Sequence, residues 1–333
     1  MKKEEIYKLY KKKIKLINKY NQFYFDKSAP IVSDKIYDDL KKDILLLESK
    51  YVFLKSNNSP GNSVGHKPSK NFLKSPHRIP MLSLANAFSE EDLINFEKKI
   101  LNFLSRKSDF KIFYSAEPKI DGISASITYK KGNFVKGLSR GDGKEGEDIT
   151  NNLNTIKDIP KHISSKDFPE EIDIRGEVFI QNSDFENMKD KFANPRNAAS
   201  GSLRQKNPED TKKIPLNFIA YTFGFENGLK VETQSEYLKK LEEWGFKVNP
   251  LNKLINGVKN LIHNYNEIEK KRADLDFDID GIVYKVNNFA LQNRLGNVAN
   301  APRWAVAHKF SSSKAVSQIK DIEIQIGRTG ALT

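Results

Sequence analysis

The chain has 333 residues, of which 38% are hydrophobic, so it is long enough to bury the cores of two compact units. No apolar run approaches the roughly 20 residues of a membrane span, and the lysine-rich start lacks the apolar stretch of a secretory leader. The absence of cysteine excludes disulfides, thiol nucleophiles and cysteine-bound zinc, while a formal charge of +13 suits a polyanionic partner such as nucleic acid. Because genomic base bias also enriches lysine, charge alone leaves nucleic-acid binding and an ordinary basic surface equally open.

Two amphipathic helices are predicted at the beginning of the chain, over residues 2–20 and 33–51. Their apolar positions repeat at helical spacing, and they are Ile6, Tyr10, Ile14 and Ile17 in the first helix and Ile36, Leu40, Ile44 and Leu47 in the second. Ser33 is the predicted N-cap of the second helix, and Pro30 marks the turn between the two. A stretch rich in proline and glycine follows, which predicts a domain boundary near residue 70.

From residue 111 onward, the period of the apolar residues changes to two, which predicts strands. The alternation in "ISASITY", the turn "KKGN" and the run "FVKGLSR" predict an antiparallel hairpin. Further strands are predicted at 171–180, 216–225, 278–286 and 303–310, with helices at 183–192 and 233–246 between them. This order predicts a mixed α+β fold with antiparallel sheets, and it lacks the regular βαβ alternation of a doubly wound sheet.

Lys119 lies in "AEPKIDG", directly before the predicted hairpin. A lysine that acts as a nucleophile must lose its proton near neutral pH, so it needs burial or nearby positive charge, and a rigid turn to direct it. Pro118 restricts the backbone before Lys119, and Gly122 allows close approach of a ligand or an unusual dihedral angle. Alone, this pattern is most often a solvated surface lysine.

Four further motifs follow Lys119 in order, each in or beside a predicted strand. They are "SRGDG" with Arg140, "IRGEVFI" with Glu177, "FDIDGIVYK" with Lys285 and "RWAVAHKF" with Lys309. Any one of them is ordinary as a strand charge, but the five parts in this order resemble the nucleotidyltransferase superfamily of DNA ligases, RNA ligases and capping enzymes. The resemblance implies a nucleotidyltransferase core, similar to ATP-grasp ligases, in which antiparallel sheets are flanked by helices.

Within this superfamily, the segments "PMLSLANAF", "RGDGKEGEDITNNLNTI" and "FANPRNAASGSLRQ" closely resemble the NAD-dependent DNA ligases of bacteria. This resemblance runs along nearly the whole chain. It implies a helical domain over 1–70 that recognises the nicotinamide mononucleotide (NMN) half of NAD, an adenylation domain over 71–316, and the beginning of an OB-fold over 317–333.

For the helical domain, the resemblance implies that Tyr24 and Tyr37 stack on the positively charged nicotinamide ring. Asp34 and Asp38 lie four residues apart on one helix face, where they add hydrogen bonds and negative charge. Taken without the downstream motifs, the same residues read as a core aromatic pair with a solvated acidic face. Phe25 departs from the Tyr or His that the family usually carries there, which puts one polar contact in doubt.

The implied reaction is attack of Lys119 on the adenylyl phosphorus of NAD, which forms enzyme-bound AMP and releases NMN as the first of three transfers that seal a nick. Cations stabilise charge that develops on phosphate oxygens, and Lys285 and Lys309 are expected to do so, with Lys285 also lowering the pKa of Lys119. For the nucleotide, the resemblance implies that Glu117 recognises adenine, that Arg140 and Glu177 contact the ribose, and that Ser83 and Leu84 line the pocket. It also implies that Asp121 and Gly122 orient the turn after Lys119. Asp280 is implied to support Lys285 or a metal-bound water. Magnesium, or manganese, is expected to bind through phosphate and water, because the few carboxylates form no dedicated cage.

Nicked double-stranded DNA is the implied partner of a monomeric enzyme in the bacterial cytoplasm, associated with the nucleoid and without a membrane. Arg196 and Arg204 are expected either to contact the DNA backbone or to form surface salt bridges. A complete ligase of this family also carries an OB-fold, a four-cysteine zinc module, helix-hairpin-helix repeats and usually a BRCT domain. Because the motifs of this sequence cover only the start of the first of these, zinc is expected only in such a missing part, and we expect self-adenylation, weak DNA binding and little nick sealing.

Two alternatives remain at this point. An ATP- or GTP-dependent ligase or capping enzyme would release pyrophosphate, and the helical hairpin would then be incidental. A non-catalytic nucleic-acid-binding module would show salt-sensitive DNA affinity without a covalent adduct or NAD binding.

Overall fold

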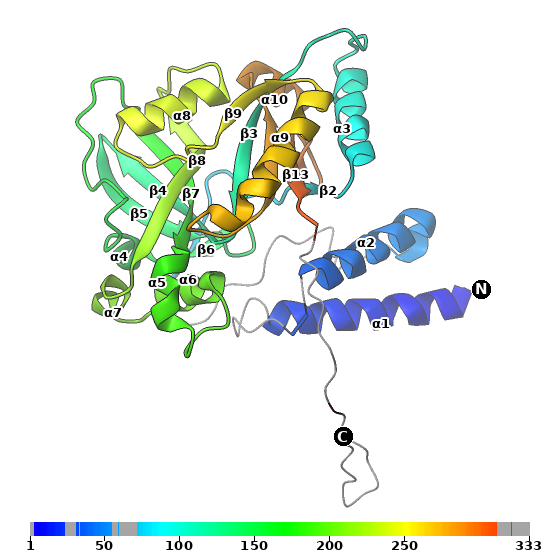
Figure 1. Cartoon of the computed structure of the whole chain (residues 1–333), viewed down its shortest axis with the longest axis horizontal. Coiled ribbons are helices and arrows are strands. Elements are labelled where there is room, and N and C mark those ends of the chain that lie inside the picture. Colours follow the sequence, from blue (N-terminus) through cyan, green and yellow to red (C-terminus); the bar gives the residue numbers. More distant parts are fainter. Residues whose placement is uncertain are drawn as a thin grey trace, which may run out of the picture.

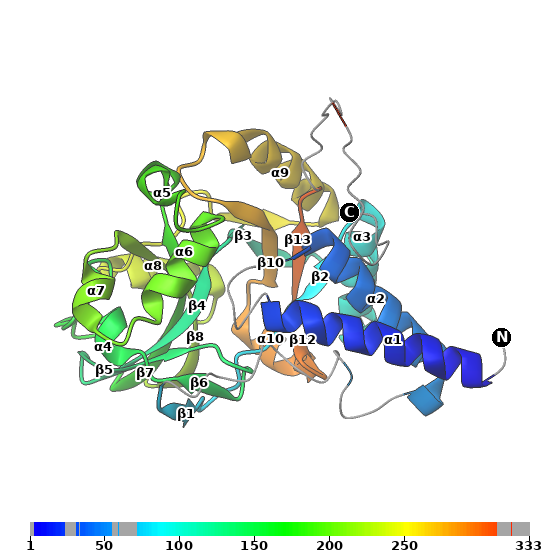
Figure 2. The same cartoon turned by 90° about the horizontal axis from the view of Figure 1, so that it is seen from below.

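A computed structural model describes residues 3–23, 31–32, 34–54, 59, 72–311 and 321 of the chain. At its N-terminal end, α1 (Lys3–Asn21) and α2 (Asp34–Lys50) lie side by side, as Figures 1 and 2 both show. They bury a small apolar cluster of their own, which consists of Ile6, Tyr10, Ile17, Leu40, Ile44 and Leu54. Both helices are therefore confirmed, although Ile36 in the first turn of α2 remains 52% exposed and the apolar stripe is shorter than predicted. The predicted N-cap Ser33 lies outside the described residues.

A buried carboxylate adds specificity to this helix pair. Glu48 is only 5% exposed, yet both of its oxygens accept hydrogen bonds, from Tyr10 Oη at 2.7 Å and Ser59 Oγ at 2.6 Å. Lys13 and Asp43 form an ion pair across the same helix interface at 2.7 Å. Because a buried charge is costly unless it is hydrogen-bonded, these partners favour one register of α1 against α2.

A five-stranded sheet forms half of the remaining structure, with strand order β2-β13-β10-β3-β9. Its strands are β2 (Ala85–Ala87), β3 (Phe113–Ile120), β9 (Lys253–Asn256), β10 (Ile279–Val286) and β13 (Ala305–Lys309). The β3, β9, β10 and β13 pairings are antiparallel, as predicted, but β2 joins the edge parallel to β13. The helices α3 (Glu90–Phe103), α9 (Val258–Lys271) and α10 (Phe289–Leu295) contribute apolar side chains to the core of this sheet; α9 lies across the sheet in Figure 1.

A four-stranded antiparallel sheet forms the other half, in the order β5-β4-β7-β8. Its strands are β4 (Ile123–Lys130), β5 (Asn133–Ser139), β7 (Glu171–Ile180) and β8 (Leu216–Asn227). The predicted hairpin is confirmed: Lys130 pairs with Asn133, and the two turn residues Lys131 and Gly132 have φ of 47° and 74°. Both turn residues are thus left-handed, as tight hairpin turns require, and glycine accommodates this at no steric cost.

One face of the four-stranded sheet is buried by helices. The helices α4 (Thr150–Leu153), α6 (Pro195–Leu203) and α8 (Gln234–Glu243) pack there against buried strand residues such as Ala125 and Ile127. A capping box at Thr233 begins α8, as the predicted helix at 233–246 required. The predicted helix at 183–192 is shorter, because it consists of α5 (Asn182–Phe185) and a 3-10 turn over Glu186–Met188.

Short elements complete the part of the chain that the structure describes. They are β1 (Lys74–Pro76), β6 (Glu145–Glu147), β11 (Asn297–Val298), β12 (Ala301–Pro302), α7 (Pro208–Lys212) and the 3-10 turns Val52–Leu54 and Arg272–Asp274. Every described helix is too short or too polar to cross a lipid bilayer. The mixed α+β class and the small helical region before the sheets are confirmed.

Strand alternation leaves a polar face on each sheet. On β3, Tyr114 and Ala116 belong to the apolar core, so Glu117 and Lys119 point to the opposite face. On β4, Ala125 and Ile127 are buried in the other core, and Ser124 therefore lies on the face turned away from it. These polar faces carry the candidate site.

Helix α3 offers a matched test of the core. Ile100 is 1% exposed and Ile94 is 52% exposed on the same helix. Ile100→Ala should lower the free energy of unfolding by about 2–5 kcal/mol, because the deleted methyl groups leave a cavity. Ile94→Ala should change it by less than about 0.5 kcal/mol. Urea unfolding followed by circular dichroism checks both values, and equal effects of the two variants would contradict the described orientation of α3.

Candidate active site

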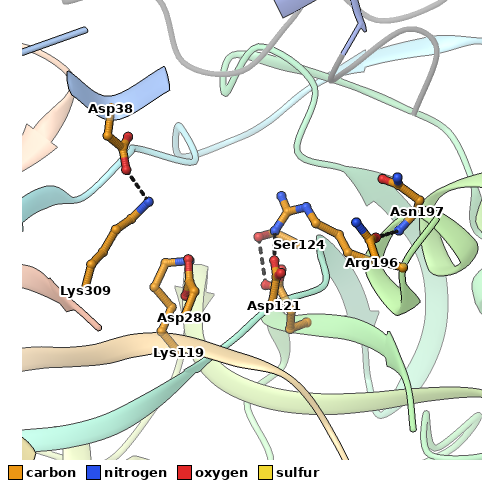
Figure 3. Close-up of polar contacts among 10 residues, drawn as sticks. Asp38, Lys119, Asp121, Ser124, Arg196, Asn197, Asp280 and Lys309 are labelled. Carbon is orange, nitrogen blue, oxygen red and sulfur yellow. Dashed lines mark hydrogen bonds and ion pairs between the residues drawn. The ribbon is translucent and has the colours of Figure 1, made fainter. Parts of the chain in front are cut away.

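Lys119 lies near the end of β3, opposite Gly281 of β10. Its ammonium donates to both carboxylate oxygens of Asp280, each at 2.9 Å (Figure 3). In a regular strand, Asp280 and Gly281 would point to opposite faces of the sheet. The ladder is irregular between Ile279 and Gly281, and such a bulge redirects the extra side chain, so Asp280 reaches the face that carries Lys119.

Asp280 decides the charge of Lys119. Burial is the largest single influence and lowers the pKa of this ammonium, but the charge of Asp280 and the hydrogen bonds to it act in the opposite direction, and the pKa lies above its ordinary value. Arg196 opposes this effect and Glu177 reinforces it. In this arrangement Lys119 is a protonated amine that is held beside a base.

The expectation that Lys285 lowers the pKa of Lys119 is wrong. Lys285 pairs with Ser115 in the sheet, whereas Gly281 pairs with Lys119. Four residues of strand separate the two positions on β10, about 13 Å at the usual rise per residue. The Lys285 ammonium instead binds Glu117 at 2.6 Å.

Asp121 and Gly122 form the turn that follows Lys119. The backbone N–H of Asp121 donates to Asp278 O at 2.8 Å, and its carboxylate binds the Arg196 guanidinium. Burial raises the pKa of Asp121, but the charge and hydrogen bond of Arg196, together with the charges of Lys119 and Lys309, hold the pKa below its usual value. A Cβ at Gly122 would lie 2.3 Å from Val178 O, so only glycine lets this turn approach β7.

Glu177 lies on β7 beside the same turn. It accepts a hydrogen bond from Ser124 Oγ at 2.9 Å. Burial raises its pKa, while the positive charges of Arg196 and Lys119 partly oppose the increase. The structure therefore brings Lys119, Asp121, Glu177 and Asp280 together, with Arg196 as a shared cation.

Glu117 lies in a second polar cluster. Its two oxygens accept from Lys285 Nζ at 2.6 Å, Ser115 Oγ at 2.8 Å and Gln234 Nε2 at 3.0 Å. The sequence analysis missed two members of this cluster, Gln234 and Tyr221. Tyr221 O accepts hydrogen bonds from both Lys285 (2.9 Å) and Gln234 (2.8 Å), and the Lys285 ammonium lies 5.3 Å from the Tyr221 ring centroid.

The sequence held a partial signal for Tyr221, because it is the one hydroxyl-bearing aromatic residue in the mainly apolar run "LNFIAY". Its contacts depend on β10 and α8, which the sequence does not place beside β8. Burial raises the pKa of Tyr221, and the negative charge of Glu177 raises it further.

Ser83 and Leu84 lie in the segment that leads into β2, and both are partly buried. Arg175 holds this segment by donating to Ile79 O and to Pro80 O, the latter at 3.3 Å. A second arginine, Arg78, makes two hydrogen bonds to Asp173 and an ion pair with Glu171. The segment is thus fixed to the four-stranded sheet at one end and to β13, through β2, at the other.

Arg140 is positioned by the same segment. His77 Nε2 contacts Arg140 O at 3.1 Å, and the backbone N–H groups of His77 and Met81 donate to Lys144 O and Gly143 O, each at 2.8 Å. Burial lowers the pKa of His77, which favours the neutral ring. The backbone of Arg140 is therefore fixed, and its positive charge acts on Glu177.

The helical region contacts the core through an ion pair between two residues, and the sequence analysis predicted each of them as a site residue without pairing them. Asp38 of α2 accepts from Lys309 Nζ of β13 at 2.5 Å, and Figure 3 shows this pair beside Lys119 and Asp280. Tyr37 instead donates its hydroxyl to Asn21 Oδ1 at 2.7 Å, within the helix pair. Tyr24, Phe25 and the side chain of Asp34 lie outside the described residues.

The two arginines predicted for DNA contact both lie on α6 or at its end. Arg196 binds Asp121, and Arg204 binds the fully buried Glu147 at 3.1 Å. Both arginines therefore form salt bridges in the structure, which is one of the two roles predicted for them. DNA contact stays a prediction.

No group of three or more His, Cys, Asp or Glu within the described residues is placed to hold a metal ion. The carboxylates around Lys119 already have partners, since Asp280 binds Lys119, Asp121 binds Arg196 and Glu177 binds Ser124. These residues fit a magnesium ion held mainly through phosphate and water, because the site supplies few free oxygen donors.

Comparison with known proteins assigns the chain to a family. The family model described as "NAD-dependent DNA ligase adenylation domain" matches residues 69–313, and the model "DNA ligase-like, N-terminal NAD+-binding domain" matches residues 3–65. The chain belongs to the NAD-dependent DNA ligase adenylation domain family. This bears out the resemblance inferred from the motifs around Lys119.

The curated relatives agree with this assignment. The chain is 66% identical to a DNA ligase of Pelagibacter ubique over 324 residues, which are 97% of this chain and 48% of that protein. It is 46% identical to a DNA ligase of Parvibaculum lavamentivorans over 325 residues, 95% of this chain and 46% of the other. The chain thus spans about half the length of the curated relatives it matches. Among solved structures, the ATP-dependent DNA ligase of bacteriophage T7 is similar at 16% identity with a TM-score of 0.34, covering 75% of this chain and 78% of that one.

The charge state of Lys119 can be tested without any substrate. Asp280→Asn should lower the pKa of Lys119, because the carboxylate that raises it is lost while burial and Arg196 remain. An NMR titration of protein labelled with 13C-lysine, with Lys119 assigned through Lys119→Arg, checks the direction. Asp276→Asn is the matched control, since Asp276 binds Ser183 and Gln181 instead. A Lys119 pKa that stays the same or rises in Asp280→Asn would contradict this account.

Proposed function

We propose that this chain transfers the adenylyl group of NAD to Lys119 and releases NMN. The observation that supports this most directly is the contact between Asp38 and Lys309. Asp38 lies in the segment that matches an N-terminal NAD+-binding family, and Lys309 lies in the segment that matches the adenylation domain. One ion pair thus joins both halves of the expected NAD site next to the candidate nucleophile.

In the proposed reaction, the Lys119 nitrogen attacks the adenylyl phosphorus. A P–N bond forms, and the P–O bond to the phosphate of NMN breaks. The nitrogen must first give up a proton, because an ammonium has no lone pair. Asp280 is the proposed acceptor, since both of its oxygens lie 2.9 Å from Lys119 Nζ. Binding of a phosphate would also give Lys309 a new anionic partner in place of Asp38.

The other polar groups are proposed to bind the nucleotide. Glu117, already held by Lys285 and Gln234, would accept from the adenine amino group. Arg140 and Glu177 would contact the ribose region, and Ser83 and Leu84 would line the pocket. A bound magnesium ion would neutralise phosphate charge, with its remaining ligands from water.

For the whole ligase, we propose that adenylation is the first step in sealing nicked double-stranded DNA. Arg196 and Arg204 would then exchange Asp121 and Glu147 for backbone phosphates. We further propose the division into a helical NMN-recognition domain over 1–70, an adenylation domain over 71–316 and a further domain that begins at 317. A monomer in the bacterial cytoplasm fits this function.

Intact-protein mass spectrometry after incubation with magnesium and NAD, ATP or GTP tests the proposal. We expect an adduct of one AMP from NAD alone. Lys119→Ala should abolish the adduct, because its amine is the attacking atom. Lys111→Ala should retain it, since Lys111 is an exposed lysine just before the same strand. An adduct from ATP alone would favour an ATP-dependent ligase, and an adduct on Lys119→Ala would refute the nucleophile.

A further inference from the structure

Two contacts between described side chains link helix α2 to the core. Asp38 binds Lys309 at 2.5 Å, and Lys42 Nζ lies 5.8 Å from the centroid of the Phe88 ring. Lys41 is three residues beyond Asp38, so both side chains lie on the same side of the helix. Lys41 therefore faces the junction between α2 and the core, and it is partly buried there.

Lys41 forms no hydrogen bond or ion pair with any residue that the structure describes, whereas the neighbouring carboxylate of Asp38 is engaged by Lys309. Burial lowers the pKa of Lys41; the Asp38 carboxylate opposes this, and the positive charges of Arg140 and Lys309 lower the pKa further. Among the described residues, the positive charges of Arg140 and Lys309 thus act on Lys41, and the Asp38 carboxylate beside it is already bound to Lys309. An ammonium that is removed from water without a partner is costly, and a bound anion would offset that cost.

We propose that Lys41, Arg140 and Lys309 form a phosphate subsite between α2 and the core, and that Lys41 binds the phosphate group that leaves with NMN. This inference rests on the proposed function and adds a residue that neither the motifs nor the resemblance assigned. Lys41 comes from the segment that matches the NAD+-binding family, which favours the NMN phosphate over the adenylyl phosphate as its ligand. A lysine suits this task, because its ammonium is a point charge that can follow a departing phosphate.

The substitution Lys41→Met tests the subsite, because it removes the charge and keeps most of the apolar stem. The KM for NAD, taken as the NAD concentration that gives the half-maximal rate of single-turnover self-adenylation, should rise about 10-fold or more, the usual range for loss of a charged hydrogen bond. The maximal single-turnover rate should change less. Lys41→Arg should restore much of the affinity. Lys12→Met is the matched control, since Lys12 is an exposed lysine on α1, and it should leave KM unchanged.

Inhibition by product analogues distinguishes a phosphate contact from a structural role. NMN and nicotinamide riboside differ only by the phosphate, so Lys41→Met should weaken inhibition by NMN and leave inhibition by the riboside unchanged. Equal weakening of both compounds, or an unchanged KM for NAD, would overturn the subsite. Weaker inhibition by AMP but not by NMN would assign Lys41 to the adenylyl phosphate and would also refute it.

A measurement on the unsubstituted protein keeps the inference testable if Lys41→Met does not fold. Lysine acetylation mapped by mass spectrometry should show Lys41 protected by NMN and not by nicotinamide riboside, while Lys12 reacts equally in both. Equal reactivity of Lys41 with and without NMN would count against the subsite. Failure of the wild-type protein to form an AMP adduct from NAD would instead refute the proposed function, so the two failures are distinguishable.

Discussion

The antiparallel pairing of β3 with β10 is the constraint on which the candidate site depends. Lys119 and Asp280 are 161 residues apart in sequence, yet the register of these strands puts the ammonium against both carboxylate oxygens. The irregularity between Ile279 and Gly281 is part of this constraint, because regular alternation would send Asp280 to the opposite face. Lys285 follows the same register and is thereby directed to Glu117.

Charge pairing organises the rest of the site. Lys119 has Asp280, Arg196 has Asp121, Lys285 has Glu117 and Lys309 has Asp38. Such pairs satisfy charges that burial would otherwise penalise. For the proposed adenylyl transfer, the network would supply cations close to the phosphate oxygens on which negative charge develops.

Within the described residues, the N-terminal helices reach the candidate site through Asp38 of α2, which binds Lys309. Their own apolar cluster, with the buried Glu48 network, holds α1 and α2 together without help from the sheets. Among the described residues, contacts with the core include the ion pair of Asp38 with Lys309 and the approach of the Lys42 ammonium to the Phe88 ring.

The sequence by itself determined the elements whose signal is local. The period-two alternation and the "KKGN" turn defined the β4–β5 hairpin, and the ordered motifs identified the family and gave Lys119 as its candidate nucleophile, because those residues are close in sequence or fixed in order. Tertiary structure decided what depends on partners distant in sequence. The parallel pairing of β2 with β13, the contacts of Tyr221 and the pairing of Lys285 with Glu117 carried no sufficient local signal. The helices α3 and α9 are different, because their apolar residues repeat at helical spacing and the sequence analysis left that local signal unassigned. The charge of Lys119 belongs with the contacts that tertiary structure decided, since burial and a carboxylate from another strand set it, and neither can be read from one stretch of chain.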